Sequence, residues 1–284
     1  MALESSYSNA SSGHRPVGAY GFTFPGLTET QLVLVPDDCD WPEIEIATEF
    51  LAAEPMVRSV TGATALLPLV DGNWAALDRR RGRATLLARR PDDTQLAHPF
   101  LATVAVIFAW WLRRHAFHGG AFADAKGGAW ALLGQRAAGK SSTLAALAAG
   151  GSTIITDDLL ALAGGSVLAG PRIIDLRPDT ARRLNATTGS VVRDGTRYRL
   201  PLGPTPAEPP LRGWIFLEWG KELSLRRLRP SEWLTAATSH LNTITSGAPS
   251  ILDLAGADAW ELTRPQTFES LETTVDQIRA LVDR

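Results

Sequence analysis

The stretch Gly134-Gln135-Arg136-Ala137-Ala138-Gly139-Lys140-Ser141-Ser142 decides the fold that this sequence predicts. It has the pattern glycine, four residues, glycine, lysine, then serine or threonine, which is typical of a phosphate-binding loop. Glycines let the backbone approach a phosphate closely, and successive N–H groups then form a nest for the anion. Lys140 adds a positive charge for the outer phosphates, and the hydroxyl of Ser141 can ligate Mg²⁺. We therefore expect the residues from Gly134 to Ser142 to bind ATP or another nucleoside triphosphate.

The segments on either side of this loop have the secondary structure that such a loop needs. Ala129–Leu133 is typical of a short buried strand, and Thr143–Ala149 is typical of a helix that Gly150-Gly151 ends. The phosphates would then lie at the N-terminus of a helix, which favours anions. The alternative is a chance loop of glycine and serine. The scarcity of lysine argues against it, because the chain has only two others, Lys126 and Lys221.

A pair of adjacent carboxylates follows the loop by one helix. The segment Ser152–Leu162 predicts an apolar strand that places Asp157-Asp158 near its C-terminal end. In open α/β sheets that end faces the ligand crevice. One carboxylate could hold a metal ion, and the other could accept the proton of an attacking hydroxyl. Neighbouring side chains of a strand point in opposite directions, so the two roles can be assigned either way, and the plainer alternative is that the pair starts a turn.

Composition limits the class of protein and of partner. The chain has 284 residues, enough for one large domain or two small ones, and 45% of them are hydrophobic. A net charge of −2 implies no surface for polyanions, so no nucleic-acid partner is expected. Cys39 is the single cysteine, which is compatible with a reducing cytoplasm. The most apolar run, Leu101–Leu112, is too short to span a bilayer, so no membrane partner is expected; a homo-oligomer is left open.

The N-terminal third predicts an arm and a small β-rich domain. Residues 1–17 are rich in Ser, Asn and Gly and are expected to be disordered, or to order on a partner. Residues 18–94 contain closely spaced strand patterns. The run Arg79–Arg83 is interpreted as a solvated hairpin tip, or as a site for an acidic partner. The strand candidates are Tyr20–Phe24, Thr30–Val35, Glu43–Ile46, Thr64–Val70, Asn73–Leu77 and Ala84–Ala88.

The nucleotide-binding domain is expected to cover residues 95–284. Pro99 begins a predicted apolar helix that runs to Arg114, with Pro in its first turn. A strand over His115–Phe122 follows, and the glycine turn after it leads into the strand of the phosphate-binding loop.

Five stretches, in this order along the chain, resemble the HPr kinase/phosphorylase superfamily. The closer likeness is to its short HPr-kinase-like relatives, which are often associated with the biosynthesis of natural products such as lasso peptides. The stretches are His118-Gly119, Gly134–Ser142, Thr156-Asp157-Asp158, Gly170–Asp179, and Leu262-Thr263-Arg264-Pro265 before a predicted helix over Phe268–Val282.

The resemblance implies an α/β fold with a phosphate-loop kinase core related to HPr kinase and phosphoenolpyruvate carboxykinase, beside a small mostly-β N-terminal region. It implies that Lys140 and the loop amides hold the triphosphate of ATP and that Ser141 binds Mg²⁺. Asp157 would activate the acceptor hydroxyl, Asp158 would help to hold the metal, and His118 would neighbour the transferred phosphoryl group. For His118 the alternative is a histidine satisfied inside a strand.

The sequence departs from HPr kinase in ways that bear on the substrate. The segment Val167–Arg172 has no glutamate where the family has a metal-linked one, and no phosphorylase segment is recognisable. We therefore expect a kinase that acts on a hydroxyl of a peptide or a small molecule rather than on HPr. The alternatives are an NTPase that works as a regulator and a module that binds a leader peptide.

Several arginines are candidates for binding phosphate or an acidic acceptor. Arg172 and Arg177 could serve as clamps, because a guanidinium suits oxyanions, or they could be ordinary surface residues. The polar segment Asn185–Arg199 is a candidate lid. Its glycines Gly189 and Gly195 would be the hinges, and its arginines Arg193, Arg197 and Arg199 would be further clamps.

Overall fold

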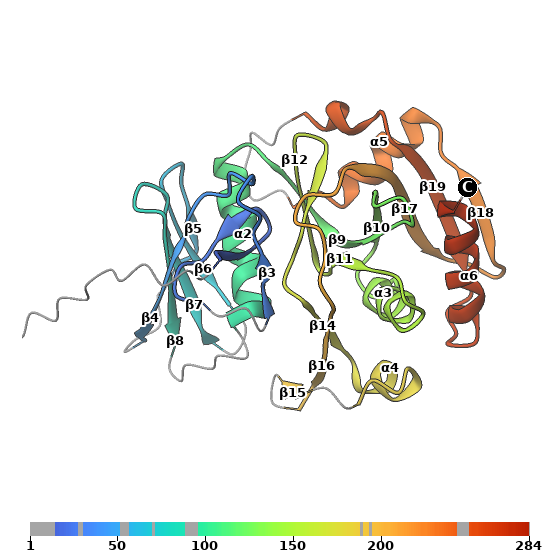
Figure 1. The fold of residues 1–284 in the computed structure, drawn as a ribbon, viewed down its shortest axis with the longest axis horizontal. Coiled ribbons are helices and arrows are strands. Elements are labelled where there is room, and N and C mark those ends of the chain that lie inside the picture. Colours follow the sequence, from blue (N-terminus) through green and yellow to red (C-terminus); the bar gives the residue numbers. More distant parts are fainter. Residues whose placement is uncertain are drawn as a thin grey trace, which may run out of the picture.

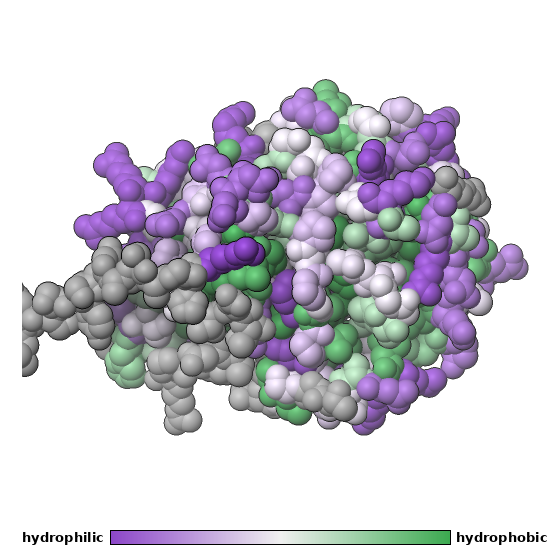
Figure 2. Space-filling view, in the orientation of Figure 1, coloured by the Kyte–Doolittle hydropathy of each residue, from purple (hydrophilic) through white to green (hydrophobic). Residues whose placement is uncertain are grey.

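The computed structural model describes residues 15–27, 31–51, 57–69, 72–88, 96–187, 190–192, 195–242 and 250–283. Within them the chain is a mixed α/β protein with four sheets. Figure 1 shows the two N-terminal sheets and helix α2 to the left of a large sheet that carries most of the helices. Hydrophilic and hydrophobic residues are interspersed over the face seen in Figure 2.

The large sheet is mixed and places three parallel strands side by side. Its strand order is β13-β12-β9-β10-β17-β19-β18, and β11 also pairs with β9. Strand β10 runs parallel to β17, and β17 runs parallel to β19, whereas the other pairs are antiparallel. The strands are β9 (His115–Ala123), β10 (Ala129–Gly134), β11 (Ile154–Thr156), β12 (Leu159–Ala163), β13 (Ser166–Leu168), β17 (Leu211–Trp219), β18 (Ser224–Arg227) and β19 (Asp258–Arg264).

Helices cover both faces of this sheet because its central strands are apolar on both sides. Helices α3 (Lys140–Ala149) and α6 (Ser270–Val282) share one hydrophobic cluster with Leu132 of β10. Helix α5 (Pro230–Ser239) belongs to the cluster on the other face, with Leu133. Neighbouring residues of β10 thus face opposite layers. A short turn of helix, η4 (Ile251–Leu254), packs in the same cluster as α5.

Helix α2 (Leu101–Trp111) joins the N-terminal sheets to the large sheet. It shares a hydrophobic cluster with the five-stranded sheet, of order β4-β8-β7-β6-β5, and with Leu159 and Ala161 of β12. A turn, η3 (Leu96–Phe100), precedes it, with His98 extended. The remaining strands here are β1 (Val17–Ala19), β2 (Phe22–Thr23), β3 (Val33–Leu34), β4 (Glu45–Phe50), β5 (Ser59–Val60), β6 (Thr64–Pro68), β7 (Trp74–Asp78) and β8 (Arg83–Ala88).

A small antiparallel sheet of order β14-β16-β15 lies beside the start of α3. It consists of β14 (Ile173–Leu176), β15 (Ser190–Val192) and β16 (Arg197–Pro201), and α4 (Pro178–Arg183) follows β14. Arg172, just before β14, is buried and donates to the carbonyls of Ile154, Ile155 and Gly203. This arginine therefore links backbone segments and is not the phosphate clamp that we considered.

Most sequence predictions of elements are confirmed, with shifted ends. Strands β9 and β10 lie where they were expected, and the arginine run Arg79–Arg83 forms the turn between β7 and β8 and the start of β8. Helix α3 begins at Lys140 rather than at residue 143. The single strand predicted for Ser152–Leu162 is two strands, β11 and β12, broken at the acidic pair. In the predicted arm, residues 1–14 lie outside the described residues, and Val17 starts β1.

Candidate active site

The carboxyl ends of the three parallel strands meet at one edge of the large sheet. Strand β10 leads into the loop that the sequence predicts to bind phosphate, β17 ends at Trp219, and β19 ends at Arg264. A cavity of about 860 Å³ lies at this edge. Ligands of open α/β sheets bind at this edge of the strands, so the cavity is the candidate active site.

The backbone of the predicted phosphate-binding loop turns through two residues with positive φ angles, one of them a glycine. Ala137 and Gly139 have positive φ angles of 68° and 83°, and helix α3 starts directly after them. A Cβ atom on Gly139 would lie 2.3 Å from Nη2 of Arg264, so a larger residue would collide with that guanidinium. The loop therefore turns tightly onto the N-terminus of α3, where N–H groups without intrahelical partners favour an anion.

Lys140 bends back over the loop. Its Nζ donates to the carbonyl oxygens of Gly134 at 2.8 Å and Gln135 at 3.1 Å. The side chain is buried, and burial lowers the pKa of its ammonium group. A buried ammonium whose partners are neutral carbonyls gains from an anion nearby, as a phosphate at the loop would be.

Asp157 lies against the start of α3. It follows β11, and its Oδ1 accepts a hydrogen bond from the hydroxyl of Ser141 at 3.1 Å. Burial raises the pKa of Asp157 to about 7, and the neighbouring charge of Asp158 adds to the rise. A carboxylate with so high a pKa is stabilised by a cation, so Ser141 and Asp157 present two oxygens suited to Mg²⁺.

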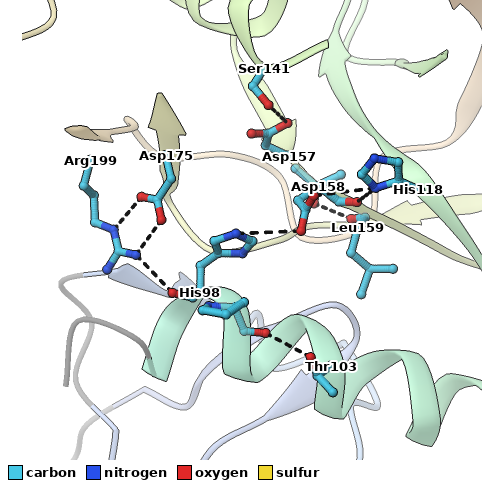
Figure 3. Close-up of polar contacts among 11 residues, drawn as sticks. His98, Thr103, His118, Ser141, Asp157, Asp158, Leu159, Asp175 and Arg199 are labelled. Atoms are coloured by element: carbon cyan, nitrogen blue, oxygen red, sulfur yellow. Dashed lines mark hydrogen bonds and ion pairs between the residues drawn. The ribbon is translucent and has the colours of Figure 1, made fainter. Parts of the chain in front are cut away.

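Asp158 turns the other way, toward two histidines. It has a positive φ of 68°, and its side chain is 44% exposed. Its Oδ1 lies 3.6 Å from Nδ1 of His118, and its Oδ2 lies 3.7 Å from Nε2 of His98 (Figure 3). Nδ1 of His118 is also 3.2 Å from the backbone oxygen of Asp158. Burial, and then the charge of Lys140, lower the pKa of His118, which favours a neutral imidazole.

His98 is a site residue that sequence analysis missed. Its carbonyl oxygen accepts from Nη2 of Arg199 at 3.2 Å (Figure 3). Arg199 also pairs with both carboxylate oxygens of Asp175 at 2.8 Å, and both side chains are almost fully buried. Arg199 thus supports the backbone at His98 and is not the phosphate clamp that we considered. No spacing in the sequence marks His98, since it lies far from Asp158 along the chain.

Sequence analysis also missed Tyr20, which lies near the acidic pair, and His240, which contacts His118. Tyr20, which is buried, lines the cavity, and burial together with the charges of Asp158 and Asp157 raises the pKa of its hydroxyl. His240 is also buried, and its carbonyl oxygen accepts from the backbone N–H of His118 at 2.9 Å. Burial, and then the charges of Lys140 and His118, lower the pKa of His240 to about 4.

The structure brings most of the predicted site residues together. One cavity is lined by Arg136, Ala137, Gly139, Lys140, Ser141, Ser142, His118, Asp157 and Asp158. The other three loop residues do not line the cavity and act through their backbone: the carbonyls of Gly134 and Gln135 accept from Lys140, and that of Ala138 accepts from Arg264 at 3.1 Å. Of the remaining clamp candidates, Arg177 and Arg197 line the cavity, whereas Arg193 lies outside the described residues, as does the candidate hinge Gly189.

Among the described residues, no cluster of three or more His, Cys, Asp or Glu side chains could hold a metal ion by itself. Mg²⁺ in nucleotide sites commonly takes one or two protein oxygens and completes its shell with phosphates and water. The pair Ser141–Asp157 fits that pattern. In the part of the chain that the structure describes, no helix is long and apolar enough to cross a membrane.

Comparisons with known proteins place few constraints on this chain. No family model matches it, and no curated protein matches it. Among solved structures, it is similar to the HPr(Ser) kinase/phosphatase from Coxiella burnetii at 14% identity, with a TM-score of 0.26, covering 58% of this chain and 90% of that one. A TM-score this low leaves the activity to be argued from the chain's own side chains.

Proposed function

We propose that this protein is a kinase that transfers the γ-phosphoryl group of ATP, or of another nucleoside triphosphate, to a hydroxyl. The observation that carries the proposal is the contact between Ser141 and Asp157 beside Lys140, at the start of the helix that follows the phosphate-binding loop. This arrangement offers an anion nest, a cation and a pair of metal-binding oxygens in one cavity. Phosphoryl transfer requires this combination of positioning and charge neutralisation.

The geometry suggests how the acidic pair divides its work. Asp157 contacts the Ser141 hydroxyl, so we assign both oxygens to Mg²⁺, which would neutralise charge on the phosphates. Asp158 faces the open cavity between His98 and His118, so we assign it as the base that takes the proton of the acceptor hydroxyl. This exchanges the roles that the family resemblance implies. The raised pKa of Asp157 agrees with a metal site as well as with a base.

The remaining side chains would prepare the transfer. Lys140 would leave the loop carbonyls and contact the outer phosphates. His118, which is neutral, would orient Asp158 and stand next to the transferred group. For the acceptor, we propose a serine or threonine of a peptide or a small molecule, in the tailoring of a natural product. That finer assignment rests on the resemblance of the motifs alone.

The test is to incubate the protein with γ-labelled ATP and Mg²⁺, with and without candidate peptides and small molecules that carry hydroxyls. Label in an acceptor supports the kinase. Label released only as phosphate, whatever acceptor is added, favours the alternative of a regulatory or leader-peptide-binding NTPase. Failure to bind ATP at all would contradict both functions.

A further inference from the structure

The cavity continues past the phosphate-binding loop to a second end that the proposed chemistry does not use. In the large sheet, the acidic pair lies on the β9 side of β10, whereas β17 and β19 lie on the other side of β10. The phosphate-binding loop follows β10 and so lies between the two ends. The second end is lined by Trp219, Arg264, Gln266, Thr267, Phe268 and Leu271.

Trp219 and Arg264 form one unit at this end. They are directly paired in the register of the parallel strands β17 and β19. The guanidinium of Arg264 lies 4.4 Å from the centre of the Trp219 ring, at stacking distance. A Cβ atom on Gly139 would lie 3.4 Å from Cη2 of Trp219, so the indole touches the last turn of the phosphate-binding loop. The part of a bound ligand that extends beyond the loop on this side would contact the ring of Trp219.

Arg264 carries a donor that lacks a partner. Arg264 is only 2% exposed, and burial lowers the pKa of its guanidinium to about 10. Nη2 donates to the carbonyl of Ala138 and to the hydroxyl of Thr143 at 3.4 Å. Among the described residues, the buried Nε has no hydrogen-bond partner, and no carboxylate shifts the pKa of the group. Burying a positive charge with no carboxylate beside it is costly, so this end of the cavity favours a ligand that brings negative charge or acceptor atoms near the guanidinium.

The loop between β19 and α6 supplies a second aromatic ring and polar groups. Phe268 is half-buried, and the guanidinium of Arg183 lies 5.1 Å from its ring centre. Gln266 and Thr267 are exposed and present an amide and a hydroxyl. Flat aromatic surfaces with a few donors and acceptors are the chemistry that binds a nucleobase, because a base has two π-faces and a polar edge.

We propose that this second end binds the nucleoside of the phosphoryl donor, with the base held against Trp219 and Phe268. The inference rests on the proposed function, since the triphosphate at the loop fixes which part of the ligand reaches this end. It assigns the two ends of the cavity: the nucleoside lies on the β17–β19 side, and the acceptor lies on the side of Asp158 and His98.

The experiment compares two ligands that share phosphates but not a base. Calorimetric titrations in the presence of Mg²⁺ measure the affinity of the full chain for ATP and for inorganic tripolyphosphate. We expect Phe268→Ala and Trp219→Leu to weaken ATP by about tenfold or more, as the loss of base stacking does, and to leave tripolyphosphate within about twofold. Phe50, which is 74% exposed on β4, provides the matched control, and Phe50→Ala should change neither affinity.

Phe268→Ala is the more direct test, because Trp219 touches Gly139 of the loop and its replacement can also disturb phosphate binding. If the ratio of the two affinities is the same in Phe268→Ala and in the unmodified protein, the nucleoside does not bind here and the inference is overturned. Equal affinity of the unmodified protein for ATP and tripolyphosphate would overturn it too. If the unmodified protein binds neither ligand, the proposed function is contradicted, and the inference that rests on it is contradicted as well.

Discussion

The hydroxyl of Ser141 donates to Oδ1 of Asp157 at 3.1 Å and thereby joins the helix after the phosphate-binding loop to the acidic pair. Oxygens at this separation can be ligands of one Mg²⁺ ion. Asp157→Asn should therefore raise the Mg²⁺ concentration needed for half-maximal turnover, and high Mg²⁺ or Mn²⁺ should restore part of the rate by mass action. The measurement is the rate of phosphate release or transfer against metal concentration.

Asp158→Asn should behave differently, since an amide cannot act as a base at neutral pH. We expect the rate to fall by roughly 10²–10⁴ with nucleotide affinity within a few-fold, and metal should not rescue it. The opposite pattern, with rescue of Asp158→Asn alone, would restore the roles implied by the family resemblance. Full activity in both variants would remove the pair from the chemistry.

Lys140→Ala should abolish transfer and weaken nucleotide binding. The ammonium group supplies a charge-assisted contact to phosphate, of order 2–4 kcal/mol in the transition state. Lys221 is exposed and does not line the cavity, so Lys221→Ala is the control and should match the unmodified protein. Near-normal turnover in Lys140→Ala would refute the assignment of the loop.

His98→Phe should lower turnover by about tenfold without changing nucleotide affinity, because Asp158 loses the imidazole beside its Oδ2. His98→Gln keeps an N–H donor near that position and should recover much of the rate. His115 contacts the carbonyl of Ser250 instead, so His115→Phe is the matched control. Equal losses in the phenylalanine and glutamine variants would mean that His98 does not act through its N–H group.

Asp175→Asn should destabilise the fold. Asp175 and Arg199 are 4% and 3% exposed, and breaking one side of a buried pair leaves an uncompensated charge that costs about 3–5 kcal/mol. A double variant in which Asp175 and Arg199 are both replaced by apolar residues of similar size should lose less free energy of unfolding than a variant with only Asp175 or only Arg199 replaced. Denaturant unfolding of the three variants measures the difference. A loss in Asp175→Asn below about 1 kcal/mol would show that the pair contributes little.

The stability of the protein should fall as the pH drops below about 6.5, in part because of His240. The folded state holds its pKa at about 4, whereas an unfolded histidine has a pKa of about 6.5. Between these values the unfolded chain binds the proton and the folded chain does not, so the stabilisation is complete above about 6.5 and is lost toward pH 4. The loss should be about 1–3 kcal/mol. His240→Phe cannot titrate and should show a smaller change between pH 7 and pH 5.

The sequence predicted the local structure around the candidate site where short-range patterns determine it. The tight turn at Gly139 and the helix that follows it were predicted from the glycines and from the apolar segments beside the loop, whereas the positive φ of Ala137 was not. The acidic pair was found because it follows an apolar strand closely. The directions in which the side chains of Asp157 and Asp158 point could not be predicted, since they depend on the break between β11 and β12 at Asp158.

The residues that were missed are held by long-range pairing. Trp219 reaches Arg264 only through the register of parallel strands, and His98 reaches Asp158 only because α2 packs against β12. A sequence shows neither register nor packing between segments so far apart. The arginines illustrate the same limit: Arg172 and Arg199 looked like clamps, but their partners are carbonyls and Asp175, which only the fold brings near.

Helix α2 packs on the five-stranded sheet and also on β9 and β12. An incomplete chain emerging from the ribosome would therefore carry this helix with part of its apolar surface still facing water until β12 has been made. The N-terminal sheets and the large sheet should consequently reach their native order in a single cooperative event rather than one after the other. Inherited changes along α2 would then affect the amount of correctly folded protein as strongly as changes in the cavity affect its turnover.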